Sequence, residues 1–135
     1  MIRRELKTFL VVGVLTVLVD FLTYRALALT AVLDTDTAKA AGFLTGTVFA
    51  YFANRGWTFG HRAHAPGSAW RFAILYLLTL ATNVWVNAVA LLLLRDVAQA
   101  AVQWAFLLAT GVSASLNFVG MKWFVFKPRP TSELP

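Results

Sequence analysis

One carboxylate, Asp20, lies within an otherwise uncharged apolar run from Thr8 to Tyr24. If this run crosses a bilayer, an ionised acid at that depth costs roughly 2.5–3.5 kcal/mol unless it faces protein, water or a partner. Such acids bind substrates, relay protons or pair with a cation. We predict that Asp20 is functional; the alternative is a structural carboxyl, either protonated or hydrogen-bonded to a neighbouring helix.

Two short segments, 54–59 (Asn-Arg-Gly-Trp-Thr-Phe) and 121–126 (Met-Lys-Trp-Phe-Val-Phe), combine a cation with aromatic residues. Arg55 offers a bidentate fork for phosphate, and Lys122 offers a compact point charge. Two such cations at one membrane face would hold a lipid phosphate while Trp57 packs on a sugar or lipid stem. The alternative is an interfacial anchor, in which the aromatic rings lie at headgroup depth and the cations snorkel.

The composition places these residues in a membrane protein. Of 135 residues, 59% are hydrophobic and 13% are charged, whereas soluble domains carry about 25% charged residues. Crossing the hydrocarbon core takes about 20 mostly apolar residues. We therefore predict an all-α membrane protein with four transmembrane helices, at about 8–29, 37–55, 71–94 and 98–121.

The charge distribution predicts the orientation. With both termini cytoplasmic, nine basic residues lie inside and three outside, which is the positive-inside bias. The net charge of +6 then reflects topology and contact with anionic lipid rather than nucleic-acid binding. The inner residues are Arg3, Arg4, Lys7, Arg55, Arg62, Arg71, Lys122, Lys127 and Arg129, and the outer ones are Arg25, Lys39 and Arg95, which Asp34, Asp36 and Asp96 neutralise.

The two halves of the chain are similar. A shift of 67 residues places Asp20 on Asn87 and Arg55 on Lys122. Two parallel two-helix repeats, related by an axis along the membrane normal, explain this correspondence. We predict one domain over 1–135, with repeats at about 8–59 and 71–126, a cytoplasmic linker at about 60–70 and a polar tail at 127–135.

Small and polar side chains recur along the helices. The second helix has a small residue at every fourth position, and such stripes let helix backbones approach closely in lipid. They pack helices within the monomer or form an oligomer interface. Because an amide facing lipid loses its hydrogen bonds, we predict that Asp20, Asn83 and Asn87 converge on one cavity between the halves. The stripe is Ala38, Gly42, Gly46 and Ala50.

No catalytic, metal or cofactor site is predicted. The chain has no cysteine. His61 and His64 lack the further ligands that a metal site requires, so solvated loop histidines are the better interpretation. No acid–base pair or nucleophile–base pair is evident, and we expect that the protein is not an enzyme.

The sequence, with four helices in two halves and the segments given below, resembles the GtrA-like membrane proteins. The resemblance rests on Phe-Leu-Val-Val-Gly at 9–13, on Asp20 beyond it, and on Asn-Arg-x-Trp-Thr-Phe at 54–59. Asn117-Phe118 and the ending of the second half agree, and the resemblance covers about 4–127. Met121 departs from the pattern, because many relatives have a second asparagine there.

The resemblance implies a role in bacterial cell-surface polysaccharide synthesis. Members are associated with moving polyprenyl-phosphate-linked monosaccharides, such as undecaprenyl-phosphate glucose, across the inner membrane, where a glycosyltransferase then uses the sugar. Other members are viewed as anchors or recruiters of partner enzymes.

A flippase is therefore the leading hypothesis. Arg55 and Lys122 would capture phosphate on the inner side and Arg25 would receive it on the outer side, while amides bind sugar hydroxyls. The competing hypotheses are a scaffold for a glycosyltransferase and a small exporter of cationic solutes. We expect a homo-oligomer or a partner protein, because four short helices enclose little volume. The predicted substrate-binding residues are Asp20, Arg25, Asn54, Arg55, Trp57, Asn83, Asn87, Asn117 and Lys122.

Overall fold

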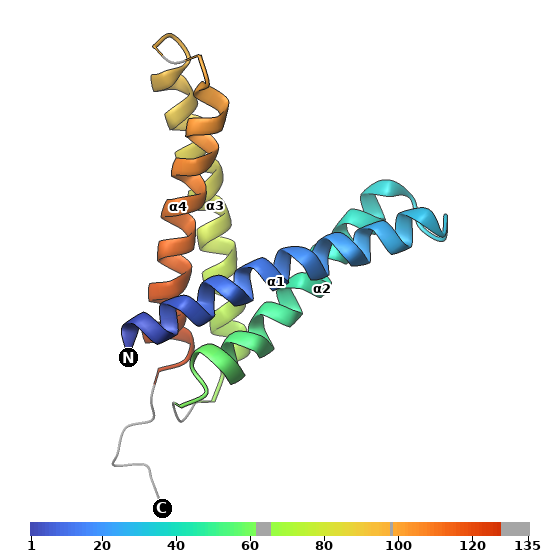
Figure 1. The fold of residues 1–135 in the computed structure, drawn as a ribbon, viewed down its shortest axis with the longest axis vertical. Helices are drawn as coiled ribbons and strands as arrows, with labels where there is room; N and C mark the ends of the chain where they lie inside the picture. Colours follow the sequence, from blue (N-terminus) through green and yellow to red (C-terminus); the bar gives the residue numbers. More distant parts are fainter. Residues whose placement is uncertain (62–65, 98, 128–135) are drawn as a thin grey trace, which may run out of the picture. The chain divides into compact units, whose positions relative to one another are not determined.

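The computed structural model is helical throughout the regular elements that it describes. It covers residues 1–61, 66–97 and 99–127, without the side chains of residues 35 and 36. Arg62, His64 and Arg129, with most of the predicted tail, lie outside the described residues. The elements are α1 (Ile2–Leu29), α2 (Thr35–Ala53), η1 (Asn54–Thr58), α3 (Ser68–Leu94), α4 (Ala101–Gly120) and η2 (Met121–Val125) (Figure 1).

The four predicted helices are confirmed; the starts of the second, third and fourth differ from the predicted starts by two or three residues, and the start of the first differs most. The first helix begins at Ile2, six residues before the expected start. The second and fourth helices each continue into a single π-helical turn, η1 or η2. In these turns the N–H of Phe59 donates to the carbonyl of Asn54 at 2.9 Å, and that of Phe126 to Met121 at 2.8 Å. Each turn therefore extends its helix by five residues.

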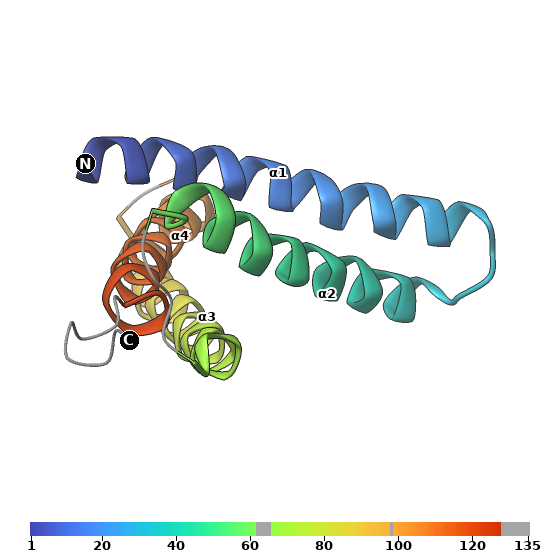
Figure 2. The ribbon, with the colours of Figure 1, turned by 90° about the horizontal axis from the view of Figure 1, so that it is seen from below.

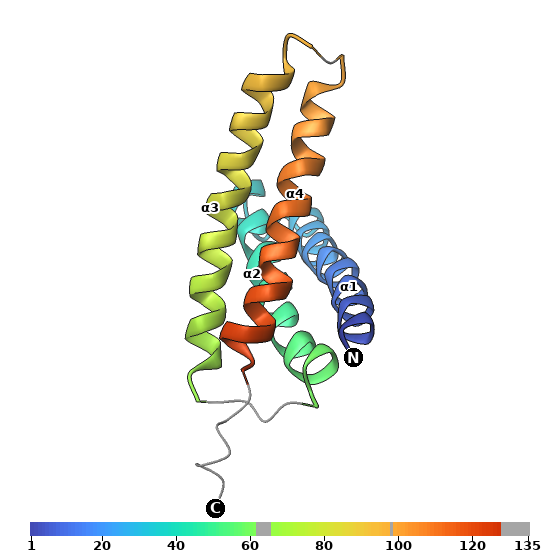
Figure 3. The same ribbon diagram turned by 90° about the vertical axis from the view of Figure 1, so that its left-hand side faces the viewer.

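The chain divides into two compact units, Met1–His61 and Arg62–Pro135. Unit 1 is a hairpin of α1 and α2 whose η1 turn packs against both helices (Figure 2). Unit 2 has the same order of elements, with α3 beside α4 and η2 packed against both (Figure 3). The parallel orientation of the two halves and their cytoplasmic termini stay predictions.

The turn between α1 and α2 is set by local hydrogen bonds. The hydroxyl of Thr30 donates to the carbonyl of Leu27 at 3.0 Å, and Ala31 has a positive φ of 52°. Asp34 then caps α2, because its carboxylate accepts from the backbone N–H of Thr37 at 3.0 Å. An acidic N-cap satisfies the first free N–H groups and suits the helix dipole. This short connection makes α1 and α2 antiparallel.

The outer faces of the helices are apolar. Large hydrophobic side chains such as Val14, Leu22 and Leu77 are more than 60% exposed, which in a soluble monomer would form exceptional surface patches. Among the described residues three helical segments are long and apolar enough to cross a membrane: Ile2–Leu29, Ser68–Leu94 and Ala101–Val125. The chain is a multi-pass membrane protein. The fourth helix, α2, is not among these three segments, and its crossing of the membrane stays a prediction.

Small residues form the contact between the helices of each hairpin. Ala38 and Ala50 of α2 are 0% and 2% exposed, and Gly42 and Gly46 between them are buried. Ala105 and Ala109 of α4 are equally buried. The predicted packing stripe is thus confirmed within the monomer, and the glycines of α2 are not available as an oligomer interface. Close backbone approach replaces the hydrophobic effect between helices in lipid.

Candidate functional site

Asp20 forms an ion pair with Lys39 across the α1–α2 hairpin. The Nζ atom of Lys39 donates to both carboxylate oxygens, at 2.9 Å and 3.1 Å. The ring of Tyr24, one turn along α1 from Asp20, has its centroid 5.8 Å from the same Nζ atom. The side chain of Asp20 is 22% exposed and that of Lys39 is 58% exposed. The acid is therefore turned toward α2, and the cation is the accessible member of the pair.

Two glycines allow this geometry. A Cβ atom at Gly42 would lie 2.6 Å from the backbone carbonyl oxygen of Asp20 and 2.7 Å from its Oδ1. At Gly46 a Cβ would lie 3.2 Å from the Cβ of Asp20. Contacts below 3.0 Å are not tolerated by real Cβ atoms. The carboxylate thus lies in a space that only glycine leaves open, and α1 and α2 approach closely at this level.

The sequence did not identify Lys39 as the partner of Asp20; the three outer cations were grouped with Asp34, Asp36 and Asp96 instead. Asp34 and Asp36 are close to Lys39 in sequence, whereas Asp20 is 19 residues away. Register alone does not pair the two residues, because Asp20 lies nine residues before the end of α1 and Lys39 only four residues after the start of α2. Arg25, the predicted outer cation, is exposed on α1.

The second hairpin holds neutral hydrogen bonds at its helix contact. The hydroxyl of Thr79 donates to Oδ1 of Asn117 at 2.9 Å, and Nδ2 of Asn83 donates to the hydroxyl of Ser113 at 2.9 Å. Asn87 is half-buried. Asn83 and Asn117 are thus used between α3 and α4 of their own unit. The convergence of Asn83 and Asn87 with Asp20 stays a prediction.

One contact recurs at the same register in both units. Gly46 of α2 lies against Thr16 of α1, where a Cβ would be 3.1 Å from the carbonyl oxygen of Thr16. The residues 67 positions further on, Ser113 and Asn83, are the hydrogen-bonded pair of unit 2. This is the offset at which the two halves of the sequence align. The two hairpins therefore bring equivalent positions of their helices together.

Asn54 stabilises the η1 turn from within. Its Nδ2 donates to the carbonyl of Ala50 at 2.9 Å, and its Oδ1 accepts from the hydroxyl of Thr58 at 2.8 Å. Asn54 is 2% exposed and Thr58 is 3% exposed. Both partners of this buried amide lie in α2 or in η1, and the predicted contact of Asn54 with substrate stays a prediction.

The cations of the two turns differ in accessibility. Arg55 is exposed, and Trp57 beside it is 57% exposed with its ring 6.1 Å from that of Phe49. Lys122 is only 8% exposed, and its Nζ atom lies 5.3 Å from the ring of Trp123. Arg55 is therefore the better placed of the two for contact with a phosphate. The joint capture of one phosphate by Arg55 and Lys122 stays a prediction.

In each unit the start of the first helix also contacts the π turn or the segment that follows it. In unit 1 the carboxylate of Glu5, 1% exposed, lies 3.1 Å from Nε2 of His61. In unit 2 the guanidinium of Arg71, 8% exposed, donates to the carbonyl of Val125 at 3.3 Å. His61 is exposed, as predicted for a loop histidine, and it also contacts this buried acid.

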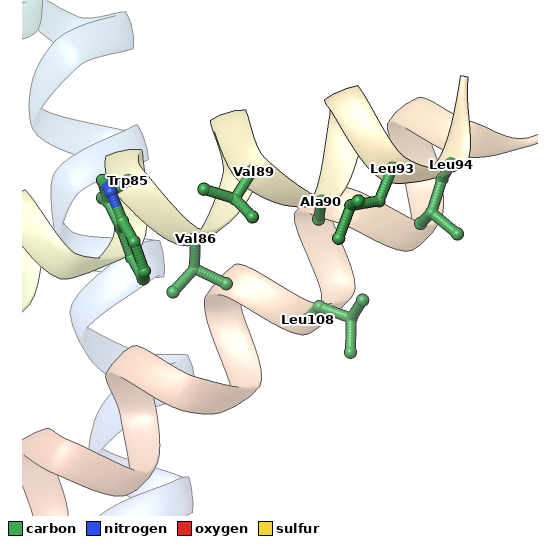
Figure 4. Close-up of a pocket in the computed structure, with 7 residues that line it drawn as sticks. All are labelled: Trp85, Val86, Val89, Ala90, Leu93, Leu94 and Leu108. Carbon is green, nitrogen blue, oxygen red and sulfur yellow. The ribbon is translucent and has the colours of Figure 1, made fainter. Parts of the chain in front are cut away.

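An apolar cavity of about 230 Å³ lies along unit 2. Its lining includes Trp85 and Leu93 of α3 and Leu108 of α4, and apart from the indole N–H it has no polar side chain (Figure 4). Such a surface suits an alkyl or isoprenoid chain rather than a sugar. Within the described part of the chain, no cluster of three or more histidine or acidic residues has the placement to hold a metal ion.

Comparison with known proteins identifies the family. No solved structure matches the chain. The family model described as "GtrA/DPMS, transmembrane domain" matches residues 8–132, which include all four helices except the first six residues of α1 and also include both π turns. The earlier resemblance to GtrA-like proteins is thereby confirmed. The chain belongs to the GtrA/DPMS transmembrane domain family, whose members are associated with the translocation of lipid-linked sugars.

Proposed function

We propose that this protein is a flippase that moves a polyprenyl-phosphate-linked monosaccharide across the bacterial inner membrane. The sugar would serve cell-surface polysaccharide synthesis or glycosylation. The observation that carries the proposal is the Asp20–Lys39 ion pair, which joins the two helices of a long apolar hairpin. Charged groups at such depth are costly and serve a pathway in most membrane proteins that keep them. Membership of the GtrA/DPMS family supplies the class of substrate.

The distribution of polar groups is consistent with such a pathway. Arg55, exposed beside an exposed Trp57, is suited to take a phosphate while the indole packs on a sugar ring. Hydroxyl and amide groups then follow the helices into the membrane-spanning part. The isoprenoid tail stays in lipid or against the apolar surface of α3, so only the headgroup needs a polar route. No residue is assigned a catalytic role.

The exporter hypothesis is weakened by the same ion pair. A carrier for cationic solutes needs a carboxylate that is open to its cargo. Here both oxygens of Asp20 accept hydrogen bonds from Lys39. A cationic solute would have to displace a cation of the protein that belongs to the same hairpin.

A scaffold that recruits a glycosyltransferase is the second candidate. Gly13 of α1 and Gly111 of α4 lie on open faces, where a Cβ would meet nothing within 4 Å. Small residues on outward faces let another helix approach closely. A partner enzyme or a second copy of the chain would bind there.

Reconstitution in liposomes tests the proposal. We expect the purified protein to accelerate the exchange of a fluorescent polyprenyl-phosphate glucose between leaflets, and a scaffold without its partner enzyme would leave the rate unchanged. Asp20→Ala or Arg55→Ala should abolish the acceleration at unchanged protein level, because each removes a group on the polar route. Leu22→Ala, at an exposed apolar side chain of α1, is the control. Wild-type rates in both charge variants would remove the site assignment.

A further inference from the structure

The ion pair of unit 1 is asymmetric in its exposure. The acid is mostly covered by α2, whereas more than half of the lysine side chain is open. One ammonium group bonds both carboxylate oxygens, yet it keeps an accessible side. An anion from the surroundings can therefore approach the cation without first moving a helix.

The lysine also reaches toward the membrane interior. Lysines near helix ends usually extend their ammonium groups to the interface. Lys39 lies in the second turn of α2, and Gly42, which is three residues further along α2, lies against Asp20. Three residues correspond to about 4.5 Å along a helix, so the ammonium extends away from the turn to meet Asp20. Asp20 thus holds the Lys39 ammonium deeper in the membrane than the interface, where a lysine near a helix end usually places it.

Arg25 is not placed to form the ion pair with Asp20. It lies five residues after Asp20 on α1, which places it about 140° around the helix. Tyr24 occupies the position beside the ammonium instead, with its ring facing Lys39. The accessible cation at depth in the hairpin is therefore Lys39.

We infer that Lys39 receives the phosphate of the lipid-linked sugar on the side of the α1–α2 turn, and that Asp20 is the positioning residue that holds the ammonium there. This inference rests on the proposed function. The phosphodiester of a polyprenyl-phosphate sugar carries one negative charge, as the Asp20 carboxylate does. It can therefore replace that carboxylate at the Lys39 ammonium. The displaced carboxylate then accepts hydrogen bonds from sugar hydroxyls. This exchange explains why an acid, which repels phosphate, lies beside a phosphate route.

Binding and translocation are measured on the same preparations. The protein is placed in phosphatidylcholine nanodiscs for binding and in liposomes for translocation, with farnesyl-phosphate glucose as the binding probe and its fluorescent long-chain form for translocation. Lys39→Gln should weaken binding about tenfold or more, as expected for a lost charge-assisted bond, and Lys39→Arg should retain most of it. Arg95→Gln, which removes an exposed cation of unit 2, is the matched control and should change binding less than twofold.

The double variant Asp20→Asn/Lys39→Gln separates a binding role from a structural one. A structural ion pair predicts that removing both charges restores protein level, binding and transport. Our inference predicts restored protein level with binding still lost. Restored binding in the double variant, or unchanged binding in Lys39→Gln, would overturn it.

The two proposals fail in different ways. Lys39-dependent binding without translocation by the wild type supports Lys39 and overturns the flippase. Normal translocation by Lys39→Gln supports the flippase and overturns Lys39, and a wild type that neither binds nor translocates overturns both. Phospholipid headgroups share the phosphodiester chemistry, so a further arm adds phosphatidylglycerol. If it displaces the probe as well as unlabelled farnesyl-phosphate glucose does, Lys39 is a general lipid contact and the inference is wrong.

Discussion

The two hairpins hold their helices together by different chemistry at equivalent positions. Unit 2 uses neutral hydrogen bonds, of which Asn83 to Ser113 is one. Unit 1 uses close glycine contacts at the same register and adds the Asp20–Lys39 ion pair one turn further on. Unit 2 shows that a hairpin of this fold needs no charge at its helix contact. The charges of unit 1 are therefore better explained by function than by stability.

The π turns also differ in polarity, and again unit 1 has the more polar contact. In η1 the buried pair Asn54 and Thr58 is polar and hydrogen-bonded. In η2 the equivalent pair, Met121 and Val125, is apolar, with exposed fractions of 2% and 0%. The backbone bond that defines the turn is the same in both. The two turns of this chain thus fill the same backbone shape in two ways, one with a hydrogen-bonded polar pair and one with an apolar pair.

Gly42→Leu should have the largest effect on stability. Its side chain would occupy the space of the Asp20 carbonyl and carboxylate, so the helices must separate and the ion pair breaks. We expect a loss of about 3 kcal/mol in the free energy of unfolding, at the upper end for overpacked sites, measured by steric trapping in bicelles. Gly13→Leu is the control, since it faces open space. Equal losses in both variants would contradict the close approach.

Changes to the buried pair of η1 should lower the free energy of unfolding by less than Gly42→Leu does. Asn54→Leu alone leaves the buried hydroxyl of Thr58 without its acceptor, and we expect a loss of about 2 kcal/mol. Asn54→Met combined with Thr58→Val copies unit 2 and should recover most of that loss. The same unfolding assay checks both. If the double variant is no more stable than Asn54→Leu, the two turns are not equivalent solutions.

Removing the amide hydrogen bond between α3 and α4 should have the smallest effect on the free energy of unfolding. A double-mutant cycle with Asn83→Ala and Ser113→Ala should yield a coupling of about 0.6 kcal/mol, because interhelical hydrogen bonds in lipid are weak. Thr82→Ala is a control, since its hydroxyl bonds only to Leu78 in its own helix. A coupling well above about 1.7 kcal/mol would show that this bond does more than join α3 to α4.

Much of the fold was predictable, but the pairing of charges was not. Long apolar runs located the four helices, and the spacing of Gly42 and Gly46 indicated the packing face. Lys39 was assigned to acids near it in sequence, because sequence distance says little about which side chains meet across a hairpin. Glu5 and His61 were missed for the same reason.

The residue types alone determined that the chain crosses a membrane, because the free energy of apolar transfer depends on composition and run length. They also singled out Asp20, because a charge among apolar neighbours is costly wherever it points. Only the folded hairpin decided that its partner is Lys39, that Asn54 closes its own turn, and that His61 contacts Glu5. These contacts depend on helix register and on which backbones lie close enough for side chains to reach, and both arise only when the helices pack.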